Sequence, residues 1–252
     1  MWQYFWGDAT PLQLAALCAS AILIGINKTG VPGLGMLPVV LLTLTFEPRL
    51  STGLQLLMLA AADVIAVSYY RRKANWKLIC RLLPSAFAGL AIGSLTLRLI
   101  DDGWLRPIIG TIILLLAAFN FIKNRFIDPE KVPSHWAFAV VVGILAGFTT
   151  QVANAAGPVM ALYLLAMRLP KTEYMGTCAW LFLILNWTKL PIFISEGRIT
   201  LNSLRADLPM LPLVVLGGVL GIVFIRKIPQ TTFNRIIEIL VLLSAIKLLI
   251  PA

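Results

Sequence analysis

The chain has 252 residues, of which 59% are hydrophobic and 13% are charged, and its net charge is +10. Soluble proteins are usually about 45–50% apolar and about 25% charged, so this composition excludes an ordinary soluble domain and predicts a protein that crosses a membrane several times. The single histidine, His135, and three separately placed cysteines form neither a metal-ligand cluster nor a disulfide framework. We therefore expect no cofactor. Without a nucleotide-binding or catalytic motif, we also expect a protein that is not an enzyme.

The first residues, MWQYFWGDAT, lack the basic start and the cleavage site of a signal peptide. Their aromatic side chains are typical of a membrane interface, so we expect this segment to be retained. A hydrocarbon core of about 30 Å needs about 20 apolar residues per helix, and the sequence supplies several such runs. The predicted full spans are residues 51–70, 78–99, 104–123, 173–195, 205–225 and 232–250.

Two further apolar regions, 11–46 and 136–167, are interrupted by polar residues, glycine and proline. The first contains NKTGVPGLGMLP and the second contains TTQVANAAGPV. Glycine and proline cost roughly 1 and 3 kcal/mol inside a helix, and backbone groups freed by a break must be buried in protein or face water. We therefore predict two broken helices inside the protein, whose second halves start near residues 34 and 158. The alternative is that these residues only kink helices and allow close packing.

The two halves of the sequence resemble each other. Gly53 aligns with Gly176 and Asp63 aligns with Asn186, while the first break aligns with the second at nearly the same offset. We predict an all-α membrane fold of two repeats, each with a broken helix pair and three transmembrane helices, about 8–10 membrane segments in total. The aligned segments are 51–70 with 174–193 and 25–44 with 147–166, and the repeats are 1–131 and 132–252 of one membrane domain.

The positive charges predict the orientation of the chain. Lysine and arginine concentrate in short cytoplasmic loops of membrane proteins. If the basic loops of this chain are cytoplasmic, the second repeat has the opposite orientation in the membrane to the first. This predicts inverted repeats with both termini outside. Inverted repeats with a site near the middle of the membrane are characteristic of secondary transporters, and this distribution explains the positive charge without a nucleic-acid partner. The basic loops are 71–81, 123–131, 168–171 and 226–235.

Both second half-helices would direct their N-termini toward the centre of the membrane. A helix N-terminus carries unpaired N–H groups and roughly half a positive charge, which predicts an anion site. Lys28, in the first break, is the expected counter-charge of the substrate, although a lysine there could instead extend to an interface. The predicted substrate-binding residues are Asn27, Lys28, Gly33, Gly35, Thr150, Gln151, Asn154, Gly157 and Asn186.

Asp63 lies in the middle of a predicted span, where a carboxylate must be paired or neutral. It could form an ion pair with Lys28 or with Lys189, which follows Asn186 by about one helical turn. It could alternatively carry protons. We therefore assign Asp63 and Lys189 to coupling or ion pairing, and the sequence leaves the choice between these roles open.

Four segments together resemble the TauE/SafE family, which is associated with sulfite export and organosulfonate transport, and the likeness covers nearly the whole chain. It implies a secondary transporter or facilitator of a small sulfur-containing anion in the bacterial inner membrane. The alternatives are a transporter of another small anion or cation, or an assembly subunit without transport; a homo-oligomer is compatible with the sequence. The segments are GINKTGVPGLGMLPVVLL, AAADVIAVSYYRRKANWKL, LAGFTTQVANAAGPVMALYLLAMRLPKTEYMGTCAW and LNWTKLPIF.

Overall fold

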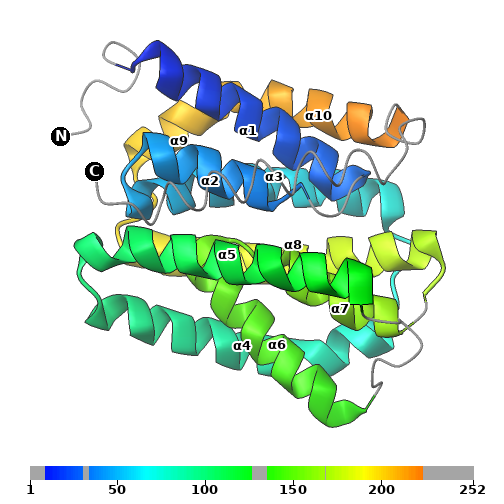
Figure 1. Ribbon diagram of the computed structural model, residues 1–252. Helices are drawn as coiled ribbons and strands as arrows, with labels where there is room; N and C mark the ends of the chain where they lie inside the picture. The colour runs from blue at the N-terminus through cyan, green and yellow to red at the C-terminus, as the bar shows by residue number, and fades with distance from the viewer. Residues whose placement is uncertain (1–8, 31–33, 127–134, 168, 224–252) are drawn as a thin grey trace.

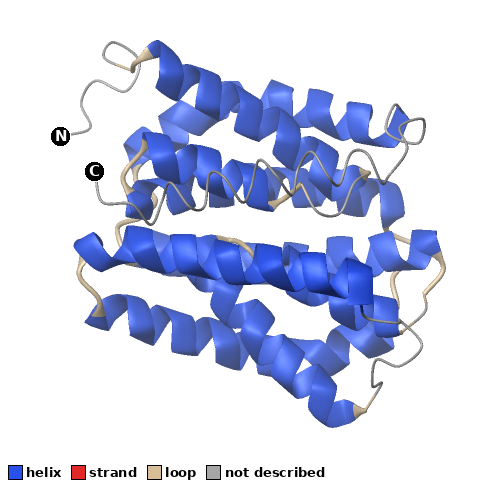
Figure 2. Ribbon diagram, viewed as in Figure 1, coloured by secondary structure: helices blue, strands red, loops and turns tan. Residues whose placement is uncertain are grey.

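The computed structural model describes residues 9–30, 34–126, 135–167 and 169–223, and every regular element in these ranges is a helix (Figure 2). Among the described residues, six helical segments are long and apolar enough to cross a membrane, so the protein is an integral membrane protein. The predicted span 232–250 lies outside the described residues. The six segments are Pro11–Thr29, Pro48–Tyr70, Trp76–Leu99, Trp136–Ala153, Thr172–Ser195 and Leu201–Val223.

The first two helices form an antiparallel pair. Helix α1 (Pro11–Thr29) starts with a capping box, in which Thr10 and Gln13 each accept a hydrogen bond from the other's backbone N–H. Helix α2 (Met36–Thr45) is half as long, and the side chain of Gln13 donates to the carbonyl of Thr45. The end of α2 therefore lies beside the start of α1, so the two helices run antiparallel.

The turn after α6 depends on one residue in an unusual conformation. Asn154 ends α6 with a positive φ of 52°, and its N–H bonds to the carbonyls of Thr149 and Thr150. Asparagine tolerates this left-handed conformation better than most residues, which lets α7 start almost at once. The remaining elements are α3 (Pro48–Tyr70), α4 (Trp76–Leu99), α5 (Asp102–Phe126), α6 (Trp136–Ala153), α7 (Gly157–Ala166), α8 (Lys171–Ser195), α9 (Leu201–Asp207), the 3₁₀ turn η2 (Leu208–Met210) and α10 (Leu211–Val223).

Two closely packed helix pairs flank the centre of the molecule. Helices α1 and α10 lie together at one edge and α4 and α6 at the other, with α3 and α8 between them (Figure 1). Gly53, near the start of α3, lies against the carbonyl of Arg198 just beyond α8, and Gly176, near the start of α8, lies against that of Lys73 just beyond α3. Helices α3 and α8 therefore run antiparallel along each other.

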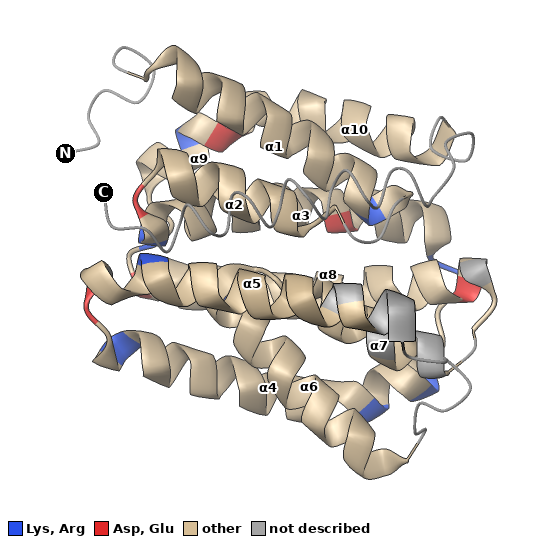
Figure 3. Ribbon diagram, viewed as in Figure 1, with Lys and Arg blue, Asp and Glu red and all other residues tan. Residues whose placement is uncertain are grey.

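Glycines bring the backbones of the outer pairs into contact. A Cβ atom added to Gly25 of α1 would lie less than 3.0 Å from the backbone of α10, and one added to Gly147 of α6 would lie equally close to the backbone of α4. Membrane helices associate through such small residues because lipid tails provide no hydrophobic drive for helices to join. Charged residues lie mostly near helix ends, with long uncharged stretches between them (Figure 3).

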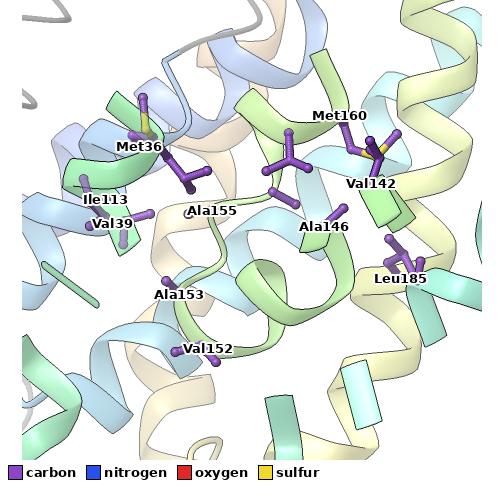
Figure 4. Close-up of a cluster of buried hydrophobic side chains, with 14 of the residues drawn as sticks. Met36, Val39, Ile113, Val142, Ala146, Val152, Ala153, Ala155, Met160 and Leu185 are labelled. Carbon is purple, nitrogen blue, oxygen red and sulfur yellow. The ribbon is translucent and has the colours of Figure 1, made fainter. Parts of the chain in front are cut away.

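The largest buried cluster holds the two short helices in place. It contains Met36 and Val39 from the first turns of α2, Ala155 from the turn before α7, and Met160 from α7 itself (Figure 4). These side chains are almost fully buried. The core therefore fixes the starts of α2 and α7 on neighbouring walls of one region inside the membrane protein.

Candidate functional site

A cavity of about 80 Å³ lies where the end of α1 meets the starts of α2 and α7. Its remaining wall is the first half of α8, from Tyr174 to Asn186. A cavity needs roughly 10–15 Å³ to hold one water molecule, so this one can admit a small polyatomic solute. Apolar side chains make up much of its surface.

Seven of the predicted substrate-binding residues line this cavity. Gln151 does not, because its side chain is fully buried and donates to Glu196, 3.4 Å away. Gly33 lies outside the described residues. The residues that line the cavity as predicted are Asn27, Lys28, Gly35, Thr150, Asn154, Gly157 and Asn186.

Both short helices begin at the cavity. Gly35 and Met36 start α2, Gly157 and Pro158 start α7, and all four residues are part of the lining. No side chain caps the N-terminus of α2, and neither helix has an acidic residue in its first turn. The cavity therefore faces two helix N-termini, each of which contributes a partial positive charge. A Cβ atom added to Gly157 would meet nothing within 4 Å, so the space in front of α7 is open.

Lys28 lies in the last turn of α1 and points into the protein. Its Nζ is 2.6 Å from Oδ1 of Asp63 and 4.2 Å from the centre of the Phe182 ring. The side chain of Lys28 is only 8% exposed, and that of Asp63 is fully buried. Asp63 therefore forms its ion pair with Lys28 and not with Lys189. The ammonium group of Lys28 lies inside the protein and does not extend to a membrane interface.

Lys189 joins the same polar network through amides. Asn186 donates to Asp63 Oδ2 at 2.6 Å and accepts from Lys189 Nζ at 3.2 Å. Lys189 Nζ also donates to Asn154 Oδ1 at 2.6 Å and to Thr150 Oγ1 at 3.0 Å. The amide orientations follow from their other partners, because Asp63 and the carbonyl of Thr52 can only accept hydrogen bonds from the two NH₂ groups.

This network contains two lysines and, among the described residues, one carboxylate. The three oxygens around Lys189 match the three N–H donors of an ammonium group, and its side chain is fully buried. Asp63 is the single carboxylate among the described residues of the network, and it already pairs with Lys28. Lys189 therefore has no anionic partner among the described residues beside the cavity, and a positive charge on it would be uncompensated. Such a buried charge is costly unless something compensates it.

A second polar cluster closes the site on the side where α8 ends. Arg198, on the loop after α8, is 2% exposed and donates to Thr52 Oγ1, the carbonyl of Gln151 and Glu196 Oε2 at 3.1–3.2 Å. Its guanidinium lies 3.5 Å from the centre of the Phe193 ring. Burial lowers the pKa of Arg198 to about 10, an effect that Glu196 opposes, so the group stays charged at neutral pH. The cavity extends toward the opposite side, where α8 begins.

Sequence reasoning missed most of the α8 wall and the Arg198 cluster. Tyr174, Cys178 and Phe182 precede Asn186 at four-residue intervals, so they lie on the same face of α8 and line the same cavity. That spacing was available in the sequence once Asn186 was assigned to the site. No local signal marked Arg198, because its burial depends on α3, α6 and the loop meeting in space.

A comparison with protein families matches residues 17–248 to the family described as "Sulfite exporter TauE/SafE". No curated protein and no solved structure matches the chain. The match includes both short helices, the cavity and the Arg198 cluster, and it confirms the resemblance drawn from the sequence motifs. Members of this family are membrane transporters of sulfur anions and not enzymes. The chain belongs to the sulfite exporter TauE/SafE family.

Proposed function

We propose that the protein is a secondary transporter or facilitator that carries sulfite, a sulfonate or a related sulfur oxyanion across the bacterial inner membrane. The substrate binds in the cavity between the starts of α2 and α7. The observation that carries this proposal is the network of two lysines and one carboxylate, Lys28, Lys189 and Asp63, which lies beside two helix N-termini inside the protein. Helix N-termini bind anions through free N–H groups and the helix dipole.

The polar groups of the cavity suit an anion with several oxygens. Asn27, Thr150 and Asn154 supply amide and hydroxyl groups, and the first turns of α2 and α7 supply backbone N–H groups. Lys28 provides the counter-charge, and Asp63 moderates it by competing for the same ammonium group. Two unit charges 4 Å apart attract by about 4 kcal/mol at an effective dielectric constant of about 20. Transport requires binding that is favourable on entry and weak enough for release, which the competing carboxylate provides.

Cation transport has less support than anion transport. A cation carrier would need Asp63 as a ligand, but the two oxygens of that carboxylate lie against Lys28 Nζ and Asn186 Nδ2 at 2.6 Å each. Two ammonium groups and two helix N-termini would also repel a cation in this cavity. The arrangement therefore favours a negative substrate.

The two halves form inverted repeats in this proposal, and the glycine contacts support it. Gly25 contacts Val214 as Gly147 contacts Ala86. Each of these close contacts between α1 and α10 has a counterpart between α6 and α4. The residue of α1 is replaced by the residue of α6 at a constant difference in residue number, and the residue of α10 is replaced by the residue of α4 at a second constant difference. Helix α1 of the first half packs on α10 of the second, and α6 of the second half packs on α4 of the first. The correspondence between these contacts therefore exchanges the two halves, as a two-fold rotation does. The other contacts are Gly217 with Ile22, Gly89 with Ile144, Gly221 with Ile26 and Gly93 with Phe148.

The hydrogen bond between Asp63 and Asn186 supports the same relation. These residues occupy aligned positions of the two repeats, and equivalent positions touch each other only close to the axis that relates them. Since α3 and α8 are antiparallel, this axis crosses the helices and lies in the plane of the membrane, which makes the repeats inverted. The site is then at the centre of the protein, where one half can move against the other.

The conformation described here is the inward-facing one in this proposal. The basic loop 71–77 and the start of α8 lie on the same side, since Gly176 contacts Lys73, and basic loops are predominantly cytoplasmic. The cavity extends toward that side, while the Arg198 cluster closes the other side. Both termini are then outside the cell, and transport requires the contacts of Arg198 with Thr52 and Gln151 to open.

Transport by the purified chain in proteoliposomes tests the proposal. We expect saturable uptake of radiolabelled sulfite or isethionate, and much weaker uptake of potassium or sodium ions. Replacing Lys28 with glutamine removes one charge-assisted hydrogen bond, worth roughly 1.5–3 kcal/mol, so the KM should rise about tenfold to hundredfold. Lys77→Gln, at an exposed position at the start of α4, is the matched control and should leave KM unchanged.

The Lys28→Gln variant leaves Asp63 buried without its partner, which could impair folding. The double variant Lys28→Gln with Asp63→Asn removes both charges, and its thermal unfolding in detergent reports whether the protein is intact. An intact double variant should still lose most of its anion uptake. Uptake equal to that of the wild type in either variant would remove Lys28 from the site, and cation uptake without anion uptake would overturn the proposed function.

A further inference from the structure

A buried carboxyl group without a partner lies at the junction of α9 and α10. Asp207 is the last residue of α9 and is 3% exposed, and neither of its oxygens has a hydrogen-bond partner among the described residues. It belongs to the apolar segment Leu201–Val223, roughly 9 Å along the helix from its start. Ionisable groups at such depth are rare and usually functional, because burying them is costly.

Among the described residues, no neighbouring element supplies a charge to Asp207. Helix α9 packs on α3, and η2 packs on α1 and α10. At the start of α3, Glu47 is exposed, and Arg49 donates to backbone carbonyls at the end of α4. The thiol of Cys18 on α1 lies 3.9 Å from the sulfur of a methionine in η2, Arg205 on α9 is exposed, and α10 has no titratable side chain. None of these groups forms an ion pair or hydrogen bond with Asp207.

Comparison of the two repeats, which rests on the function proposed above, shows that the fold does not require this carboxyl group. The contacts of Gly53 and Gly176 show that the start of α9 corresponds to the start of α4. The glycine contacts of α10 show that α10 also corresponds to α4, but the difference in residue number is three larger than for α9. Three residues is the length of η2. Asp207 corresponds to Leu82 by the difference in residue number found for α9, and to Ile79 by the difference found for α10. Both of these residues are apolar and fully buried.

One 3₁₀ turn is therefore inserted directly after the carboxyl group. A 3₁₀ turn within a helical segment often marks a hinge, because its hydrogen bonds can change register. A carboxylate in apolar surroundings is far less favourable than the neutral acid, and contact with water reverses this preference. A movement at η2 that admits water would change the protonation of Asp207.

We propose that Asp207 takes up and releases one proton in each transport cycle and thereby couples movement of the sulfur anion to a proton gradient. In the conformation described here the O–H bond is intact and the acid is neutral. In the alternate conformation water reaches the group, the O–H bond breaks, the proton passes to water and the carboxylate is hydrated. The coupling site is then separate from the substrate cavity, which is lined by Lys28.

Accumulation of radiolabelled isethionate by proteoliposomes tests this assignment. Isethionate keeps its charge at every relevant pH, so its distribution reports coupling by the protein, and valinomycin with equal potassium on both sides holds the membrane potential at zero. One proton per anion across a gradient of about one pH unit supports up to about tenfold accumulation. We expect accumulation with the wild-type chain in one orientation of the gradient, and none with Asp207→Asn, which should retain isethionate exchange.

Asp101→Asn, at an exposed position before α5, is the matched control and should accumulate isethionate as the wild type does. Asp207→Leu, which places in the second repeat the residue found at Leu82 in the first, should fold and exchange isethionate without accumulating it. Gradient-driven accumulation by Asp207→Asn, or its absence in a wild-type chain that exchanges isethionate, would overturn the coupling role and leave the proposed function intact. A wild-type chain that moves neither isethionate nor sulfite would overturn both.

Discussion

Replacing Gly25 with alanine measures how closely α1 and α10 must approach. The new Cβ atom would lie 2.6 Å from the backbone nitrogen of Gly218 and closer still to the carbonyl oxygen of Val214, whereas ordinary contacts begin at 3.4 Å. Both atoms belong to the backbone of α10 and cannot rotate away, so the helices must separate by roughly 1 Å, which a close-packed interior resists.

Two opposing effects set the magnitude. Overpacking costs about 1–3 kcal/mol, and a clash with backbone atoms belongs at the upper end of this range. Alanine gains about 1 kcal/mol over glycine in helix propensity. We therefore expect Gly25→Ala to lower the free energy of unfolding by about 2 kcal/mol, and Gly147→Ala, at the equivalent contact between α6 and α4, to lower it by a similar amount.

Unfolding in mixed detergent micelles, followed by tryptophan fluorescence, measures this quantity. Gly103→Ala is the matched control, because a Cβ atom at Gly103 in α5 would meet nothing within 4 Å. It should be neutral or stabilising by up to about 1 kcal/mol. If Gly25→Ala were as stable as Gly103→Ala, the close approach of α1 and α10 would be refuted. If Gly25→Ala and Gly147→Ala differed widely, the equivalence of the two helix pairs would fail.

Three further predictions concern the cavity. Asp63→Asn removes the carboxylate that competes for Lys28, so sulfite should bind about tenfold more tightly, as one charge-assisted hydrogen bond is worth roughly 1.5–3 kcal/mol; unchanged affinity in an equilibrium binding assay would place the ion pair outside the site. Lys189→Met leaves two buried amide oxygens without a donor, at about 1–3 kcal/mol each, so its thermal midpoint should fall well below that of the wild type, and an unchanged midpoint would contradict the network. An anionic methanethiosulfonate should block isethionate uptake through Cys178, with protection by unlabelled isethionate, and Cys178→Ser should abolish the block while Cys80→Ser should not.

The apolar runs were sufficient to predict the helices because membrane spans have a strong local signal of length and composition. Helices α2 and α7 begin at Met36 and Gly157, close to the starts expected at residues 34 and 158. Glycine and proline mark these positions because their backbone costs are local and independent of the rest of the chain.

The interior polar network was only partly predictable. An ionisable residue within a membrane span needs a partner, and this requirement identified Asp63 and Lys28 as members of the network. It did not determine whether Asp63 pairs with Lys28 or with Lys189. Arg198 follows Glu196 and Gly197 in a short polar loop, a pattern typical of a solvated turn, and its burial results from segments that are distant in the sequence. Asp207 lies two residues before a proline within an apolar helical segment, and its lack of a partner among the described residues is a property of the assembled helices.

The contact between Asp63 and Asn186 also explains why two identical halves would make a poor carrier. Two aspartates facing each other at the crossing of α3 and α8 would have to share a proton, because like charges at that distance cannot both ionise. Two asparagines would leave both lysines uncancelled and retain an anion too firmly to let it go. One acid opposite one amide is the intermediate case, so in the proposed repeat arrangement a difference between the halves at this single contact would set how strongly the site attracts an anion.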